Sequence, residues 1–132
     1  MRLHPFLRQT ATSLALLVAF GCDSSTDPTS RRDAAGTYVL ESVSGRGPVS
    51  GTFTLFADGR AERRIRYASL PTESIASGTF EVTPPRILFS LHEEGSVAYY
   101  EWIVRGELSG RSFSIHYPDP ADGPDIVETY RK

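Results

Sequence analysis

The sequence predicts an all-β fold, a single eight-stranded antiparallel up-and-down barrel after an N-terminal signal peptide. Three observations support this prediction. β-Branched and aromatic residues dominate the apolar runs of the 132-residue chain, and such residues favour strands. No segment sustains the i, i+3, i+4, i+7 apolar spacing of an amphipathic helix. Turn signals rich in Gly, Pro and Asp separate the runs at short intervals.

Cys22 is the only cysteine, and it follows a short apolar run near the start of the chain. Arg2 and Arg8 supply positive charge, residues 10–20 the apolar stretch, and Gly21 a small residue before a cleavage point, which is the order found in an export signal. The run is too short to cross a membrane as a helix, because that takes roughly 20 apolar residues. The arrangement resembles the bacterial lipoprotein signal, in which the peptide is cut before the cysteine and the thiol is acylated.

This resemblance implies that residues 1–21 are a lipoprotein signal peptide and that Cys22 carries acyl chains, so that the membrane is a partner. Secretion with a free thiol and a buried structural cysteine are the alternatives. Residues 22–34 are almost entirely polar, which predicts a lipidated cysteine and a flexible tether. Residues 35–132 suffice for one domain. The expected location is the cell envelope, on the periplasmic side of the inner or outer membrane.

The charge balance argues against one class of partner. The chain has 14 Lys and Arg residues against 16 Asp and Glu residues, a formal net charge of −2. A nucleic-acid-binding domain normally shows a net basic face, so we expect no nucleic-acid partner, and we expect a monomer. One basic cluster, Arg60, Arg63, Arg64 and Arg66, falls within an expected strand. A solvated strand face explains it better than a patch for headgroups or a ligand.

The first three expected strands are separated by clear turns. Residues 36–43 alternate apolar and polar side chains and end at a Gly- and Pro-rich segment. Residues 51–56 form the second strand. Asp58 and Gly59 give a tight-turn signal that leads into the third strand at 60–67.

The remaining strands follow a looser stretch at residues 68–75. They are expected at 78–82, 86–91, 97–108, 111–117 and 126–130. Short antiparallel strands joined mostly by tight turns can close on themselves, and closure removes exposed edges. The alternation points these residues inward: Tyr38, Leu40, Phe53, Leu55, Ile65, Tyr67, Phe80, Val82, Ile87, Phe89, Tyr100, Trp102, Val104, Leu108, Phe113 and Ile115.

Short motifs along these strands resemble small bacterial lipocalin-like lipoprotein domains. The first strand opens Gly-Thr-Tyr at 36–38, Gly-x-Phe starts recur at Gly51 and Gly78, and residues 106–110 read Gly-Glu-Leu-Ser-Gly before a penultimate strand. The chain ends Tyr-Arg-Lys. The resemblance covers most of residues 34–132. It implies a calycin-type barrel that binds small apolar molecules, an implication that rests on the fold alone.

One inward position is charged. If Ile65 and Tyr67 face inward, Arg63 does too, and a buried guanidinium is costly unless a carboxylate pairs with it. Glu128 is the best partner by pattern, with Glu101 next. The favoured interpretation is nevertheless that Arg63 lies near the open end of its strand and reaches water.

The corresponding hypothesis is a ligand site at the barrel mouth, in which Arg63 orients the anionic end of an amphiphile. Tyr67, Tyr100 and Trp102 would supply apolar walls, and Glu128 would pair with the arginine.

Other chemistry finds little support. We expect no catalytic residues, no cofactor and no enzyme activity, because no Gly-x-Ser-x-Gly elbow or metal-ligand spacing occurs. Asp119, Asp122 and Asp125 lie close together, but the spacing is not that of a calcium loop, and a solvated turn is preferred. The favoured function is a lipid-anchored barrel that binds a small apolar or amphiphilic ligand. The alternative is a protein-interaction or inhibitor module that acts through loops 68–76 and 118–125 and has a filled core.

Overall fold

The computed structural model describes residues 28–95 and 101–132. The predicted signal peptide, Cys22 and Tyr100 therefore lie outside the described residues, as does the start of the expected sixth strand. In the part of the chain that is described, no helix is long and apolar enough to cross a membrane.

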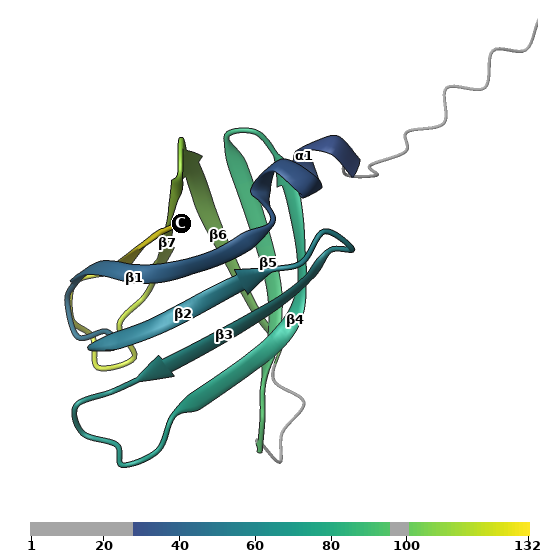
Figure 1. The fold of residues 1–132 in the computed structure, drawn as a ribbon. Coiled ribbons are helices and arrows are strands. Elements are labelled where there is room, and N and C mark those ends of the chain that lie inside the picture. The colour runs from purple at the N-terminus through teal and green to yellow at the C-terminus, as the bar shows by residue number, and fades with distance from the viewer. Residues whose placement is uncertain (1–27, 96–100) are drawn as a thin grey trace, which may run out of the picture.

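The strands close into an eight-stranded antiparallel barrel in chain order, as the sequence predicts (Figure 1). Each strand pairs with the next, and the last returns to the first. Because each of these strands has a partner on both sides, closure leaves no exposed edge between them. The strands are β1 (Gly36–Ser44), β2 (Ser50–Leu55), β3 (Arg60–Arg66), β4 (Ser74–Thr83), β5 (Arg86–Glu93), β6 (Glu101–Ser109), β7 (Ser112–Tyr117) and β8 (Ile126–Arg131).

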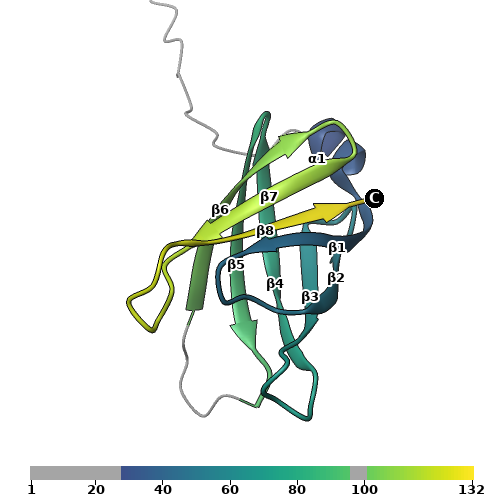
Figure 2. The ribbon, with the colours of Figure 1, turned by 90° about the vertical axis from the view of Figure 1, so that its left-hand side faces the viewer.

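The barrel has two unlike ends. Short turns join β2 to β3, β4 to β5 and β6 to β7 at the end where the helix α1 (Pro28–Ala34) lies. Longer loops join β1 to β2, β3 to β4 and β7 to β8 at the opposite end (Figure 2). We call these the closed end and the open end.

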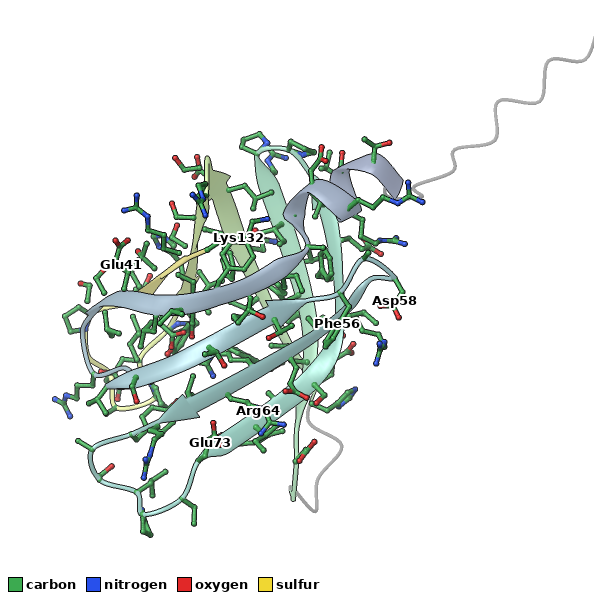
Figure 3. All side chains as sticks on the ribbon, viewed as in Figure 1. Glu41, Phe56, Asp58, Arg64, Glu73 and Lys132 are labelled. Atoms are coloured by element: carbon green, nitrogen blue, oxygen red, sulfur yellow. The ribbon has the colours of Figure 1, made fainter. Side chains whose placement is uncertain are left out.

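The turn between β2 and β3 is at the closed end and confirms the Asp58-Gly59 signal. Gly59 has a φ of 93°, in the left-handed region that favours glycine. The Asp58 carboxylate accepts hydrogen bonds from the backbone N–H of Arg60 at 3.1 Å and from its Nε at 2.7 Å. Figure 3 shows Asp58 and Phe56 together at this turn.

The helix α1 was not expected, because its residues are polar. Contacts with the barrel hold it. Ala34 is buried, and its carbonyl oxygen accepts a 2.7 Å hydrogen bond from the Tyr38 hydroxyl. Lys132 donates from its ammonium group to the carbonyl oxygens of Asp33 at 3.2 Å and Ala35 at 2.8 Å, where helix carbonyls lack partners. Residues 28–34 thus belong to the folded part of the chain, although the sequence predicted a flexible tether over 22–34.

The interior confirms most of the expected inward residues. An aromatic cluster occupies it, with Tyr130 stacked on Phe113 at 5.3 Å between ring centroids. Leu40, Tyr67, Trp102 and Leu108 are only partly buried. Ala61, Ala76 and Leu91 are buried although they were not expected to be, and the burial of Ile126 and Tyr130 decides the inward face of β8, which the sequence left open. We define the aromatic cluster as Tyr38, Phe53, Phe80, Phe89, Phe113 and Tyr130.

β4 begins at Ser74 rather than at residue 78, so part of the looser stretch is strand. Most of its first residues, Ser74, Ala76 and Ser77, have little strand propensity, but the segment pairs with β3 and β5 on either side, and pairing overrides local preference. At Gly78 a Cβ atom would run into the backbone carbonyl of Ser90 on β5. The two strands therefore approach closely at a position that only glycine fits.

The basic cluster on β3 is split by the pleat. Arg60, Arg64 and Arg66 are exposed on the outer face, whereas Arg63 is buried. The Nε of Arg64 lies 2.5 Å from the Oε1 of Glu62, and Figure 3 shows Arg64 on the outside of the barrel. The outer part of the cluster is the solvated strand face that was expected.

Candidate functional site

A cavity of about 480 Å³ occupies the open end of the barrel. Its walls come from β3 to β7 and from the loop after β7, and they combine aromatic and apolar side chains with a few polar groups. The lining residues are Arg63, Tyr67, Ser74, Ala76, Leu91, Glu93, Trp102, Tyr117, Pro118 and Pro120.

The cavity exists because the inward side chains of β4 are small near the open end. Ser74, Ala76 and Gly78 occupy successive positions on one face of the strand, and Phe80 and Val82 follow on the same face toward the closed end. None of the residues of the aromatic cluster lines the cavity. The interior is therefore filled toward α1 and open toward the long loops.

Arg63 and Glu128 lie at the inner boundary of this cavity. Arg63 on β3 is 5% exposed and Glu128 on β8 is fully buried. The guanidinium Nη2 donates to Oε1 of Glu128, and Nε donates to the hydroxyl of Tyr130 at 3.2 Å. This confirms Glu128 as the partner that the strand pattern favoured. The favoured prediction that Arg63 reaches water at the strand end is wrong, because its side chain is buried against Glu128.

Two tyrosines complete a polar network around the carboxylate. Tyr117 donates its hydroxyl proton to Oε1 of Glu128, and Tyr130 donates to Oε2 at 2.5 Å. Burial raises the pKa of both phenols well above the usual value, so they stay neutral donors. Burial alone would lower the pKa of Arg63, but Tyr130 and Glu128 raise it beyond the usual value. We call Arg63, Tyr117, Glu128 and Tyr130 the polar network.

Trp102 covers one face of the arginine. The Arg63 Cζ lies 5.0 Å from the centroid of the Trp102 ring, a cation–π contact. Tyr117 meets the same ring edge-on, with 5.2 Å between centroids. Glu128 and Tyr130 thus accept hydrogen bonds from the edge of the guanidinium, and the Trp102 ring packs on its face.

The structure brings together three of the five predicted ligand-site residues on one surface, because Arg63, Tyr67 and Trp102 all line the cavity. Glu128 lies behind Arg63 and is not part of the lining. Tyr100 is outside the described residues. Whether these residues bind a ligand stays a prediction.

Sequence reasoning missed other members of the site. Tyr117 lies on the inward face of β7 with Phe113 and Ile115, so its alternation was a usable signal. The small side chains of Ser74 and Ala76 leave space for the cavity and could have indicated it. The irregular composition before the expected strand at 78–82 hid their inward position.

The loop between β7 and β8 contains Asp119, Asp122 and Asp125. Among residues 28–95 and 101–132, no group of His, Cys, Asp and Glu side chains is arranged to hold a metal ion. Asp119 organises the loop instead. Its Oδ1 accepts from the backbone N–H of Ala121 at 2.9 Å, and its carbonyl oxygen accepts from the N–H of Asp122 at 3.1 Å. This is a turn-forming role for aspartate.

Comparison with known proteins finds no match. No family model matches the chain, and neither a curated protein nor a solved structure does. The function must therefore be inferred from the site itself.

Proposed function

We propose that this barrel binds a small amphiphilic molecule in the cavity at its open end, and that it is a binding protein rather than an enzyme. The observation that carries the proposal is the cavity of about 480 Å³ with a buried guanidinium at its inner boundary. Small-molecule sites are typically apolar hollows of roughly 300–1,000 Å³ with a few convergent polar groups. Trp102, Tyr67 and Leu91 would contact the apolar part of the ligand, and Arg63 its polar end.

The cavity also favours this function over a protein-interaction module. The alternative prediction was a barrel with a filled core that acts through its loops. The aromatic cluster does fill the interior near α1, but the walls of the open end enclose space that no described side chain occupies. A ligand in that space would bury apolar surface, which stabilises a complex by about 25 cal/mol per Å².

The test is capture of an apolar fluorescent probe. Nile red is titrated into the purified protein, and its emission and the quenching of Trp102, the only tryptophan, are followed. Ala76→Phe places a ring in the cavity, and we expect it to weaken binding at least tenfold. The matched control is Leu88→Phe on the outer face of β5, where the side chain is 37% exposed, and it should bind as the wild type does. Equal binding by both variants would place the probe elsewhere and contradict the proposal.

We propose further that the barrel is held at a membrane of the cell envelope by acyl chains on Cys22. The proposal rests on the signal-like order of residues 1–22, and two acyl chains suffice for stable anchoring. Expression in a bacterial host should give protein in the membrane fraction with the mass of the acylated form. Cys22→Ser should release it to the soluble fraction, whereas Ser24→Ala should not. Soluble wild-type protein without acyl mass would contradict the proposal.

The place of α1 sets the orientation of such an anchored barrel. Cys22 lies only six residues before Pro28, where α1 begins at the closed end. Six extended residues span at most roughly 20 Å. The closed end would then stay near the bilayer, and the cavity would face the aqueous side.

A further inference from the structure

The ligand's polar end can be specified further, and this step rests on the proposed function. We propose that the cavity selects amphiphiles whose polar end is an uncharged hydrogen-bond acceptor, such as an ester, amide or ketone carbonyl, over those that end in a carboxylate. The contacts of Arg63 and the charges around it support this selection.

Arg63 has donors left for a ligand. A guanidinium carries five N–H groups, and the barrel uses the one on Nε and one on Nη2. Among the described residues, no partner is seen for Nη1. Among these residues, the side-chain N and O atoms that are inaccessible to solvent and lack a hydrogen-bond partner are Arg31 Nε and Asp119 Oδ2. Nη1 is not one of them, so it is accessible. Because Arg63 lines the cavity, these N–H groups are available to an acceptor within it.

The positive charge of Arg63, by contrast, is already balanced. Glu128 lies against it as a buried ion pair, and its oxygens accept from Arg63, Tyr117 and Tyr130. Acceptance from such donors is the bonding pattern of an ionised carboxylate. Glu93 adds a second acidic group on the cavity wall, where it accepts from the Ser74 hydroxyl. A carboxylate ligand would thus bring a further negative charge to a site with one positive and two negative groups.

The buried Arg63–Glu128 pair dominates this charge count, because Glu93 is exposed to solvent. Like charges repel more strongly where water is excluded, and an anion that enters the cavity also loses its hydration. A carbonyl oxygen accepts the same hydrogen bond from Nη1 without either penalty. The face of the guanidinium is covered by Trp102 at 5.0 Å, so the ligand would approach the N–H edge. This replaces the expectation of an anionic end with a neutral one.

The experiment compares four ligands that share one apolar chain. Methyl decanoate, decanoate, decylammonium and undecane are titrated against the full-length mature protein at neutral pH, with Trp102 emission and displacement of Nile red as readouts. We expect methyl decanoate to bind at least ~tenfold more tightly than decanoate, in line with one uncompensated charge in a low-dielectric site. We expect it also to exceed undecane and decylammonium.

Glu128→Gln tests the cause of the selection. It keeps the shape and one of the two acceptor oxygens but removes the negative charge, so decanoate should gain at least ~tenfold in affinity relative to methyl decanoate. Glu81→Gln makes the same change in charge on the outer face of β4 and should alter neither. If Glu128→Gln does not fold, Glu93→Gln at the cavity wall serves instead, with a smaller gain for decanoate expected.

The outcomes separate the two proposals. Tightest binding of decanoate or decylammonium by the wild type, or equal binding of undecane and methyl decanoate, would overturn the selection and leave the ligand-binding function standing. Failure of all four ligands and of Nile red to bind would overturn the function, and the selection with it.

Discussion

The half of the barrel next to α1 is filled with aromatic rings, whereas the half toward the long loops holds an ion pair and a cavity. Phe53, Phe89 and Phe113 are at most 1% exposed, and their centroids lie 4.6–5.5 Å apart. Across the boundary, Arg63 is 5% exposed and Glu128 is fully buried, and both are charged. Both halves belong to one sheet, so the difference lies only in which side chains face inward.

The difference indicates where the barrel is built for stability and where it is built for another purpose. Burying a large aromatic side chain stabilises a fold by several kcal/mol. A buried ion pair gives little net stability, because the loss of hydration offsets the attraction, and apolar residues of similar volume often do as well. The polar network therefore adds little to stability that an apolar filling would not supply. Its position against the cavity supports a role in binding.

The largest expected effect comes from the aromatic half. Phe113 touches Tyr38, Phe53, Phe89 and Tyr130, so Phe113→Ala leaves a hole that several rings border. We expect the free energy of unfolding to fall by about 3–5 kcal/mol, measured by urea denaturation. Ligand affinity of the folded variant should be nearly unchanged, since Phe113 does not line the cavity. A loss below about 1 kcal/mol would contradict the view that this half supplies the stability.

Breaking the ion pair should be almost as costly. Glu128→Ala leaves the Arg63 guanidinium buried without its carboxylate, a defect that typically costs about 3–5 kcal/mol. The lower end of that range is expected here, because Arg63 borders the cavity and water there can solvate it in part. Urea denaturation measures the loss. A value like that of an exposed glutamate such as Glu81, within about 0.5 kcal/mol, would show that the pair is not coupled.

Alkaline pH should weaken the polar network next. Burial raises the pKa of Tyr130 above that of an unfolded chain, which is about 10. Above pH 10 the unfolded chain loses the phenol proton while the folded chain keeps it, so stability falls as pH rises toward the folded pKa. One such group gives a limiting slope of about 1.4 kcal/mol per pH unit. Tyr130→Phe should flatten the slope of unfolding free energy against pH, and an unchanged slope would contradict this account.

The sequence predicts one part of this contrast between the two halves of the barrel and not the other. Period-two alternation placed Phe53, Phe89 and Phe113 inside. The same alternation directed Arg63 inward and made Glu128 the first of two candidate partners. Those features follow from strand geometry alone. Strand geometry does not show how far along the barrel axis the interior is filled. That depends on which inward residues of different strands lie at the same height in the closed barrel.

The helix α1 and the start of β4 could not be predicted for a related reason. The order of both segments comes from tertiary partners, Tyr38 and Lys132 for α1, and the neighbouring strands for Ser74. A sequence window carries no record of such partners. Tyr117, on the other hand, was within reach, since it alternates with Phe113 and Ile115.

The cap at the closed end should show a smaller effect. The Tyr38 hydroxyl donates to the Ala34 carbonyl at 2.7 Å, and Tyr38→Phe removes this bond while keeping the ring. We expect a loss of about 1 kcal/mol in urea denaturation, together with faster amide exchange in α1. Exchange should not change in β8, which serves as the internal control. Unchanged exchange in α1 would mean that other contacts hold the helix.

The smallest effect on stability should come from replacing the buried part of the polar network as a whole. Arg63→Met, Glu128→Leu and Tyr130→Phe together leave no charge or sealed hydroxyl unpaired, and Tyr117 keeps access to the cavity that it lines. Such exchanges are often neutral or stabilising by about 1–4 kcal/mol, so urea denaturation should show no loss.

The same triple variant should lose most of its preference for methyl decanoate over undecane, because the N–H donors of Arg63 are gone and only the Tyr117 hydroxyl replaces them. Nile red should still bind. Leu88→Met on the outer face is the control for both measurements. A loss of several kcal/mol with normal selection among ligands would reverse the comparison, since the polar network would then serve the fold and not the ligand.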